Sequence, residues 1–360
     1  MIKVGITHGD INGIGYEVIL KTFGDIRMAE MCIPVIYGSP KAAAYHRKAL
    51  DLPAVAFNQI TDAKEAVVNK VNIINCIGED VKVELGVSSE AAGNAAFAAL
   101  ERACADLQNG LIDVLVTAPI NKHNIQREDF HFPGHTEYLE EKFGKAGDKS
   151  LMILAKDNLR VALVTGHIPL SEIPQKLTKE RIVEAAKLFE TSLKRDFRVG
   201  NPRIAVLSLN PHAGENGLLG SEENDIIIPA IKELQEKHSL CFGPYAADGF
   251  FGSSDFMNFD GILAMYHDQG LAPFKTIAME EGVNFTAGLP VIRTSPAHGT
   301  AYALAGKNEA SEESFRQAVY MAIDTYQNRT EYDKAYVNPL RKLYVERGGD
   351  NEVLDLTKEE

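Results

Sequence analysis

Three histidines each follow a short apolar segment of the chain. They are His167, His212 and His267. Apolar runs of this length are typical of buried strands, and ligands of open α/β sheets bind beyond the carboxyl ends of the strands. Three imidazoles that met there would suit a divalent ion such as Zn²⁺, with a fourth position open. The spacing is not a regular ligand motif, so three unrelated loop histidines are the alternative.

A cation held at this place would have a definite use. An alcohol does not ionise at neutral pH, and a bound cation stabilises the alkoxide that must form before a hydride can leave the same carbon. A nicotinamide cofactor would accept that hydride. The histidines therefore indicate the oxidation of a hydroxyl group.

Several polar residues could bind an anionic group near such a centre. Lys275, Asn284 and Arg293 lie between hydrophobic segments, and an arginine offers a bidentate fork to phosphate or carboxylate. His135 and Thr136 follow Pro-Gly just before a predicted helix, where Thr136 is expected to be the cap and free N–H groups favour an anion. Ordinary surface positions and a plain helix cap are the alternatives.

Two glycine-containing segments are harder to interpret. Residues 9–15 follow the first strand and open a helix, but their spacing is not the G-x-G-x-x-G of a dinucleotide loop, and a turn-and-cap role is equally open. Residues 298–306 are rich in small side chains, which permit close approach of the backbone to a ligand.

Strand and helix patterns alternate along the chain, which predicts a mainly parallel sheet covered by helices. Strands are predicted at 2–6, 33–37, 71–74, 112–116, 161–164, 204–209 and 262–265, and helices at 14–21, 94–108, 179–195 and 312–326. The length of 360 residues indicates two domains or one large α/β unit, with crossing points near 131–136 and 290–300. The tail from Asp350 is acidic and is expected to fray.

The composition excludes several classes of function. A net charge of −13 argues against nucleic acid or an anionic membrane as a partner. The four cysteines form no C-x-x-C pair, no apolar run is long enough to cross a membrane, and the N-terminus lacks the pattern of a signal peptide. A cytoplasmic location is therefore expected.

Taken together, the polar segments resemble the PdxA family, the 4-hydroxythreonine-4-phosphate dehydrogenases of vitamin B6 (pyridoxine) biosynthesis. The matching segments are 9–17, 117–122, 133–139, 165–167, 209–215, 243–248, 266–270 and 293–301. They occur in order over nearly the whole chain, so their combination is specific although each segment alone is not.

The resemblance implies an α/β fold like that of isocitrate and isopropylmalate dehydrogenases, with two domains flanking a central cleft. Residues 1–130 with 295–360 would form the cofactor-side domain, and residues 131–294 the domain on the metal and dimer side. A homodimer would complete each active site. The cofactors would be NAD or NADP and one divalent ion, Zn²⁺, Mg²⁺ or Co²⁺.

The resemblance also assigns roles to residues. The metal ligands would be His167, His212 and His267; the substrate would contact His135, Thr136, Lys275, Asn284 and Arg293; the cofactor would contact His298, Gly299 and Thr300. The general base stays open among His135, Asp248 and Lys275.

The implied reaction oxidises 4-phosphooxy-L-threonine at C3 to a β-keto acid, which loses CO₂ to give 3-amino-2-oxopropyl phosphate. Related enzymes act on D-threonate or D-erythronate 4-phosphate, and a non-catalytic phosphometabolite-binding protein is a remote alternative. The chain departs from the family at Ile11, Asn12, Tyr16, Pro296 and Ala297. The last two precede the presumed cofactor loop and leave the choice between NAD and NADP open.

Overall fold

The computed structural model describes residues 1–78, 81–145 and 147–338, and its centre is one continuous twelve-stranded sheet. The strand order is β3-β4-β2-β1-β5-β12-β11-β6-β7-β10-β8-β9. The strands are β1 (Lys3–Thr7), β2 (Ile33–Gly38), β3 (Phe57–Ile60), β4 (Val71–Asn75), β5 (Val114–Thr117), β6 (Leu151–Lys156), β7 (Leu159–Leu163), β8 (Arg203–Leu207), β9 (Leu240–Tyr245), β10 (Gly261–Ala264), β11 (Val283–Ala287) and β12 (Arg293–Pro296). The predicted mainly parallel sheet is confirmed: the only antiparallel pairs among the described strands are β12–β11, β11–β6 and β6–β7.

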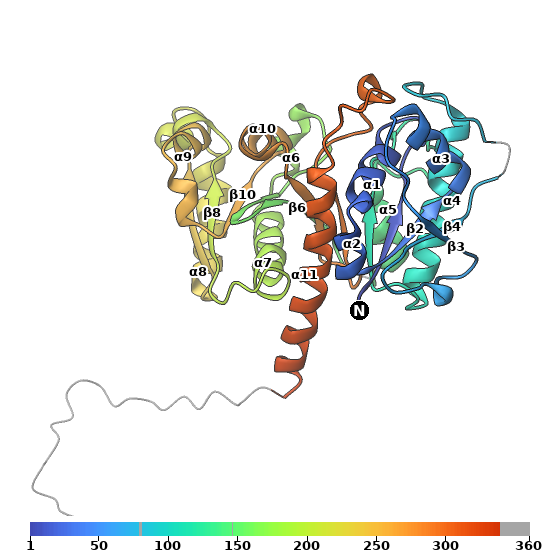
Figure 1. Cartoon of the computed structure of the whole chain (residues 1–360). Helices are drawn as coiled ribbons and strands as arrows, with labels where there is room; N and C mark the ends of the chain where they lie inside the picture. Colours follow the sequence, from blue (N-terminus) through green and yellow to red (C-terminus); the bar gives the residue numbers. More distant parts are fainter. Residues whose placement is uncertain (79–80, 146, 339–360) are drawn as a thin grey trace, which may run out of the picture.

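Helices cover both faces of the sheet (Figure 1). They are α1 (Gly15–Gly24), α2 (Ile26–Met31), α3 (Pro40–Ala49), α4 (Glu90–Gln108), α5 (His135–Phe143), α6 (Ile173–Lys176), α7 (Lys179–Arg195), α8 (Ile228–Glu236), α9 (Ala247–Gly252), α10 (His267–Ala278) and α11 (Glu313–Tyr336). Alternate residues of one strand point to opposite faces, and in β10 Leu263 joins the core under α7 whereas Ile262 joins the core under α10. Both faces are therefore buried, which explains why these strands read as continuous apolar runs.

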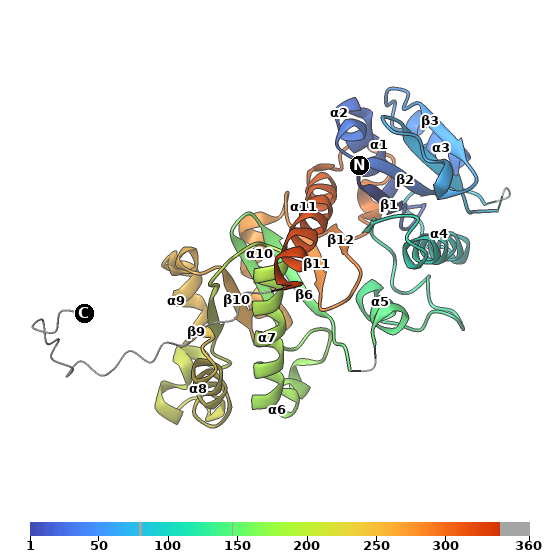
Figure 2. The same ribbon diagram turned by 90° about the horizontal axis from the view of Figure 1, so that it is seen from below.

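The long helix α11 lies along the junction between the two halves of the sheet. It packs on β12, β11 and β5, and it also contacts α1 and α7. Figures 1 and 2 show it between the N-terminal half and the lobe that carries α7 to α10. The division into 1–130 with 295–360 and 131–294 stays a prediction, because the sheet and the largest core cluster run through both parts.

Several local predictions can be compared directly with the structure. Helix α7 has the predicted bounds and is capped by Thr178, whose side chain accepts a hydrogen bond from the Arg181 N–H. The cap predicted at Thr136 is wrong: α5 begins at His135, with Gly134 at the N-cap and no side-chain cap. The predicted fraying from Asp350 falls outside the described residues.

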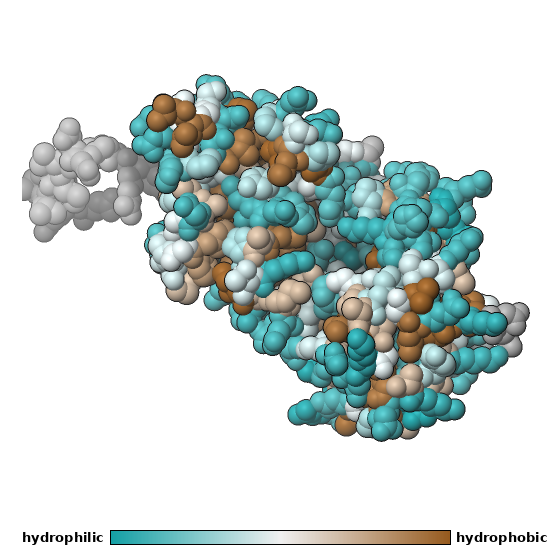
Figure 3. Space-filling model, turned by 90° about the horizontal axis from the view of Figure 1, so that it is seen from above, coloured by the Kyte–Doolittle hydropathy of each residue, from teal (hydrophilic) through white to brown (hydrophobic). Residues whose placement is uncertain are grey.

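The surface carries few large apolar side chains. Leu218 and Met257, 79% and 71% exposed, are the most exposed leucine and methionine of the described chain, and both belong to the lobe with α8 and α9. Figure 3 shows hydrophobic groups among hydrophilic ones over this half of the molecule. Among the described helices, none is long and apolar enough to cross a membrane.

Candidate functional site

A pocket of about 260 Å³ lies beyond the carboxyl ends of β5, β7, β10 and β12. Its walls come from the segment after β5, the start of α5, strands β6 and β11, helix α10 and the segment after β12. A ligand was predicted at this place from the sequence, because parallel strands bring their carboxyl ends to one edge of the sheet.

Nearly all the residues predicted for the site line this one pocket. They are His135, Thr136, His167, His267, Lys275, Asn284, Arg293, His298 and Gly299. Three predicted residues do not line it. Thr300 lies next to its rim, Asp248 is exposed on α9, and His212 is exposed in the turn Pro211–Gly217.

Arg293 is a buried cation at the bottom of the pocket. Its side chain is at the start of β12, and its guanidinium donates to the Thr117 Oγ1 at 2.7 and 3.0 Å and to the Thr286 Oγ1 at 3.4 Å. Burial lowers the pKa of Arg293 from 12.5 to about 10, so the group stays charged at neutral pH. Within the described chain, no carboxylate forms an ion pair with it at contact distance, although the charge of Glu137 in the same pocket raises its pKa. A buried charge without a counter-ion favours an anionic ligand.

Three further polar atoms of the pocket are buried and have no partner in the described chain. They are the Nε2 of His135, the Oδ1 of Asn284 and the Nε2 of His298. Burial, and then the nearby charges of Arg293 and Lys122, hold the pKa of His135 well below its usual value, so its imidazole is neutral. Buried polar groups are normally hydrogen-bonded, so these atoms are placed to meet polar groups of a ligand.

His167 and His267 form a pair at the edge of the same pocket. Their ring centroids are 5.4 Å apart. Each ring has a carboxylate at its Nδ1, with Glu137 Oε1 at 3.7 Å from His167 and Asp268 Oδ1 at 2.6 Å from His267. The pKa of Glu137 is lowered, first of all by its hydrogen bond to His167. Carboxylates at Nδ1 orient imidazoles so that Nε2 is free to bind a metal.

One chain alone does not assemble the predicted three-histidine centre. Among the described residues, no group of three or more His, Cys, Asp or Glu side chains is close enough to hold a metal ion. The pair His167 and His267 fits two positions of such a centre, since both are imidazoles with oriented rings. His212 does not join them within its own chain.

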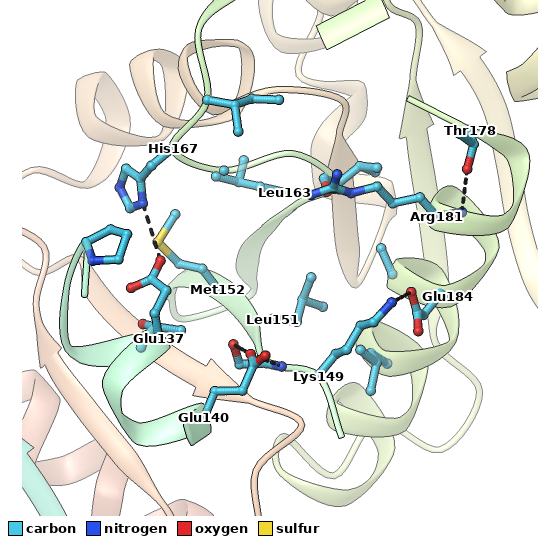
Figure 4. A pocket seen from close by; sticks show the side chains of 18 of the residues that line it. Glu137, Glu140, Lys149, Leu151, Met152, Leu163, His167, Thr178, Arg181 and Glu184 are labelled. Carbon is cyan, nitrogen blue, oxygen red and sulfur yellow. Dashed lines mark hydrogen bonds and ion pairs between the residues drawn. The ribbon is translucent and has the colours of Figure 1, made fainter. Parts of the chain in front are cut away.

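A second and larger hollow adjoins the pocket on the His167 side. Its volume is about 660 Å³, and it shares Thr136, Glu137, Met152 and His167 with the first pocket. Figure 4 shows His167 and Glu137 facing each other at one end, with Arg181 and Glu184 of α7 at the other. There is therefore open space beside the histidine pair.

The segment 298–302 is held against the turn of residues 9–15. The Ile14 N–H donates to the Thr300 carbonyl at 3.1 Å, and the Tyr302 hydroxyl donates to Asp10 Oδ2 at 2.7 Å. A Cβ on Gly13 would lie 2.7 Å from the Thr300 oxygen, so a side chain there would prevent this approach. These contacts favour the turn-and-cap role for residues 9–15 over the role of a dinucleotide loop.

The departures from the family pattern have local structural partners. Asn12 is fully buried; its side chain donates to the Val87 carbonyl and Ser89 Oγ and accepts from the Glu84 N–H, which ties the turn to residues 84–89. Tyr16 stacks on His8 with ring centroids 5.1 Å apart.

At the second departure, the Ala297 N–H donates to the Gly282 carbonyl at 3.0 Å and the Ser314 Oγ at 3.1 Å. Ala297 thereby fixes the entry to the segment 298–302. Nothing in the structure explains why proline and alanine stand at 296 and 297.

Sequence reasoning gave no role to three residues that the structure places here. Lys122 lines the pocket, Thr117 holds the Arg293 guanidinium, and Glu137 orients His167. Thr117 is the last residue of β5, and Lys122 ends the short segment that follows this strand. Their position at the carboxyl end of a strand could have indicated a role in the site.

The fold and the site define a class: an α/β protein with a small polar pocket, lined by a buried arginine and paired histidines, at the carboxyl edge of its sheet. The chain belongs to the PdxA family, since the model described as "Pyridoxal phosphate biosynthetic protein PdxA" matches residues 30–322. This finding confirms the resemblance predicted from the sequence and with it the dehydrogenase class.

Known proteins agree with this assignment. A 4-hydroxythreonine-4-phosphate dehydrogenase of Bacteroides thetaiotaomicron is 63% identical over 99% of this chain and 97% of its own length. A putative D-threonate 4-phosphate dehydrogenase of Oceanobacillus iheyensis is 38% identical over 89% of this chain and 97% of its own. The crystal structure of the Klebsiella pneumoniae 4-hydroxythreonine-4-phosphate dehydrogenase superposes with a TM-score of 0.78 at 32% identity, covering 91% of this chain and 98% of that one. The α/β fold class is thereby confirmed.

Proposed function

We propose that this protein is a metal- and NAD(P)-dependent dehydrogenase that oxidises 4-phosphooxy-L-threonine at C3. The observation that carries the proposal is the buried, unpaired guanidinium of Arg293 in the same pocket as the His167–His267 pair. The names of the relatives add the substrate class. An anion site beside a metal-binding pair is what a phosphorylated hydroxy acid requires.

The reaction balances in two stages. The C3 hydroxyl loses its proton and C3 gives a hydride to the nicotinamide, which leaves a ketone at C3. The product is a β-keto acid, and its carboxylate departs as CO₂ because the neighbouring carbonyl accepts the electron pair of the broken bond. Protonation then gives 3-amino-2-oxopropyl phosphate.

The pocket residues divide this work by charge. Arg293 and Lys275 bind the anionic groups of the substrate, with Lys122 at the rim. His135, neutral because its pKa is lowered, turns an unpartnered Nε2 towards the ligand and accepts a hydrogen bond from a hydroxyl. Of the three candidates for the general base, His135 and Lys275 line the pocket and Asp248 does not. We infer that His135 is the base.

A divalent ion would be held by His167 and His267 of one chain and by His212 of a second copy. When bound, such an ion supplies a Lewis acid that stabilises the alkoxide at C3. A set of three imidazoles favours Zn²⁺ or Co²⁺ over Mg²⁺, which prefers oxygen ligands.

A homodimer accounts for the position of His212 on the surface. The turn Pro211–Gly217 is followed by Leu218 and Leu219, 79% and 44% exposed, and an exposed leucine pair beside His212 is suited to burial against another chain. The open space of about 660 Å³ beside His167 gives an incoming turn room to enter. A monomer in sedimentation experiments, with metal bound, would contradict this arrangement.

One second candidate keeps the chemistry and changes the substrate. D-threonate 4-phosphate has a hydroxyl where 4-phosphooxy-threonine has an amine, and a relative carries that name. Glu137, Asn284 and His135 are the pocket groups that could distinguish an ammonium from a hydroxyl. A side-by-side comparison of kcat/KM for the two substrates separates the candidates.

The test of the proposal is reduction of the nicotinamide. Purified protein loaded with Zn²⁺ or Co²⁺ is mixed with NAD or NADP and 4-phosphooxy-L-threonine, and reduced cofactor and released CO₂ are both measured. We expect equal amounts of the two products. Tight binding of the substrate without any reduced cofactor would instead favour the non-catalytic binding protein.

A further inference from the structure

The turn that carries His212 has a backbone conformation that side chains disfavour. Six consecutive residues have φ in the left-handed region: His212 51°, Ala213 52°, Gly214 77°, Glu215 43°, Asn216 57° and Gly217 98°. Four of them are not glycine, and a side chain disfavours this conformation. Contacts with the surrounding structure must therefore stabilise the turn, and the turn carries a predicted metal ligand, His212.

A single buried carboxylate holds the entry to the turn. Glu223 is 2% exposed, and its Oε1 accepts hydrogen bonds from the N–H groups of Leu209 and Asn210, both at 2.8 Å. Its Oε2 accepts from the Asn210 Nδ2 at 3.0 Å. A Cβ on Gly214 would lie 2.6 Å from that Oε2, so the carboxylate also fills the space inside the turn.

The carboxylate is placed by an unusual helical segment. Glu223 begins the π-helical stretch Glu223–Ile227, which runs into α8, and π-helical turns are frequent at functional sites. In the described chain the hydrogen-bond donors to Glu223 are the N–H groups of Leu209 and Asn210 and the Asn210 Nδ2, none of which is a cation. Its charge is therefore satisfied by backbone and amide donors of the turn, and these hydrogen bonds to a charged acceptor are strong.

The backbone that leads into this turn is also fixed to the segment between β10 and α10, where His267 begins the helix. The Ser208 carbonyl accepts from the Gln269 Nε2 at 2.6 Å, and the Gln269 Oε1 accepts from the Met265 N–H at 2.8 Å. The Thr165 Oγ1 donates to the Met265 carbonyl at 2.6 Å. The backbone ahead of all three histidines is thus joined into one hydrogen-bonded unit, and Glu223 adds the last link before His212.

We propose that Glu223 is a positioning residue that fixes the left-handed turn and so presents His212 to the His167–His267 pair of a second copy. The inference rests on the proposed role of His212 as a ligand. Glu223 itself lies inside the turn and has no place among the ligands.

The test compares metal binding by four proteins in the absence of substrate and cofactor: the wild type, H212A, E223Q and the control E236Q. In E223Q an amide nitrogen takes the place of Oε2 and faces the Asn210 Nδ2. Two hydrogen-bond donors then face each other, and the hydrogen bond is lost. Glu236 is an exposed glutamate at the end of α8, outside the turn. The affinity for Co²⁺ is titrated, the visible Co²⁺ spectrum is recorded, and inorganic phosphate binding reports the state of the Arg293 pocket.

We expect H212A to have the lowest affinity for Co²⁺ of the four proteins. In E223Q the affinity for Co²⁺ should fall ten- to a hundredfold, as is usual when a residue that orients a ligand is replaced. E223Q should share an altered Co²⁺ spectrum with H212A, whereas its phosphate affinity and cooperative unfolding are retained. E236Q should match the wild type in every measurement.

The two hypotheses fail in different ways. If H212A binds Co²⁺ like the wild type, the proposed ligand set is wrong and the role of Glu223 falls with it. If H212A loses the metal but E223Q keeps wild-type affinity and spectrum, only the positioning role is overturned. Should E223Q not fold, G214A decides in its place, because its added Cβ meets the same Glu223 oxygen at φ 77°.

Discussion

Replacing Arg293 by methionine should strongly weaken anion binding while the chain still folds. Methionine keeps most of the volume of the side chain and removes its charge. In the wild type the guanidinium is 3% exposed and has only hydroxyl partners in the described chain. The fall of its pKa from 12.5 to about 10 corresponds to ~3 kcal/mol by which burial disfavours the charge. The lost charge-assisted hydrogen bonds to Thr117 and Thr286 act in the opposite direction, by about 1.5–3 kcal/mol for each threonine.

These opposing contributions predict a free energy of unfolding in R293M that is unchanged or lower by up to about 3 kcal/mol. Binding should weaken strongly, because a charge-assisted hydrogen bond contributes about 1.5–3 kcal/mol and charges ~4 Å apart interact by ~4 kcal/mol at an effective dielectric constant of 20. We expect the affinity for inorganic phosphate and for 4-phosphooxy-threonine to fall about 30- to 1,000-fold. R293K, which keeps the charge and loses the fork, should fall between R293M and the wild type.

The measurement is isothermal titration calorimetry at several salt concentrations, together with urea unfolding. Arg160 offers a matched control, since it is also buried, its pKa is also lowered by burial, and it lies outside the pocket over the Phe197 ring. R160M should bind phosphate like the wild type. Wild-type phosphate affinity in R293M would refute the reasoning and place the anion elsewhere.

Two further predictions concern pH and the segment 298–302. Burial lowers the pKa of His8 to about 3 and that of His46 to about 4, so between pH 6.5 and 4 the unfolded chain binds protons that the folded chain does not. The free energy of unfolding should therefore fall as the pH drops below 6.5, by ~2 kcal/mol per histidine at pH 5; urea titrations that show equal stability at pH 7 and pH 5 would contradict this. Y302F removes the hydroxyl that donates to Asp10, and we expect a several-fold weaker dinucleotide affinity in fluorescence titration with unchanged phosphate affinity; an unchanged Kd for both NAD and NADP would remove Tyr302 from the support of this segment.

Much of the fold followed from patterns that are local in the chain. The apolar runs that became β2 and β10 were recognisable because strands buried on both faces are apolar at nearly every position. Helix α7 was found with its bounds because its apolar positions recur with helical spacing behind a threonine cap. The cap at Thr136 was wrong because Gly134 already ends the extended backbone and the helix begins one residue early.

The antiparallel strands at the junction of the sheet were not predicted. Strands β11 and β12 contain Asn284, Thr286 and Arg293, whose polar side chains hide the apolar pattern of a strand. Those same polar side chains line or support the pocket. Residues that serve a ligand break the local rules from which strands are recognised.

The sequence by itself determined the chemical inventory of the site: imidazoles at strand ends, and cations and amides in the segments that follow. It could do so because parallel strands place their carboxyl ends at one edge, whatever the details of packing. Only the tertiary structure decided that Arg293 is buried with no carboxylate in direct contact, and that His167 and His267 meet while His212 lies on the surface. It also decided that Glu223 contacts the backbone just before the turn that carries His212. Burial and proximity depend on contacts between segments far apart in the chain, and no local pattern encodes those distances.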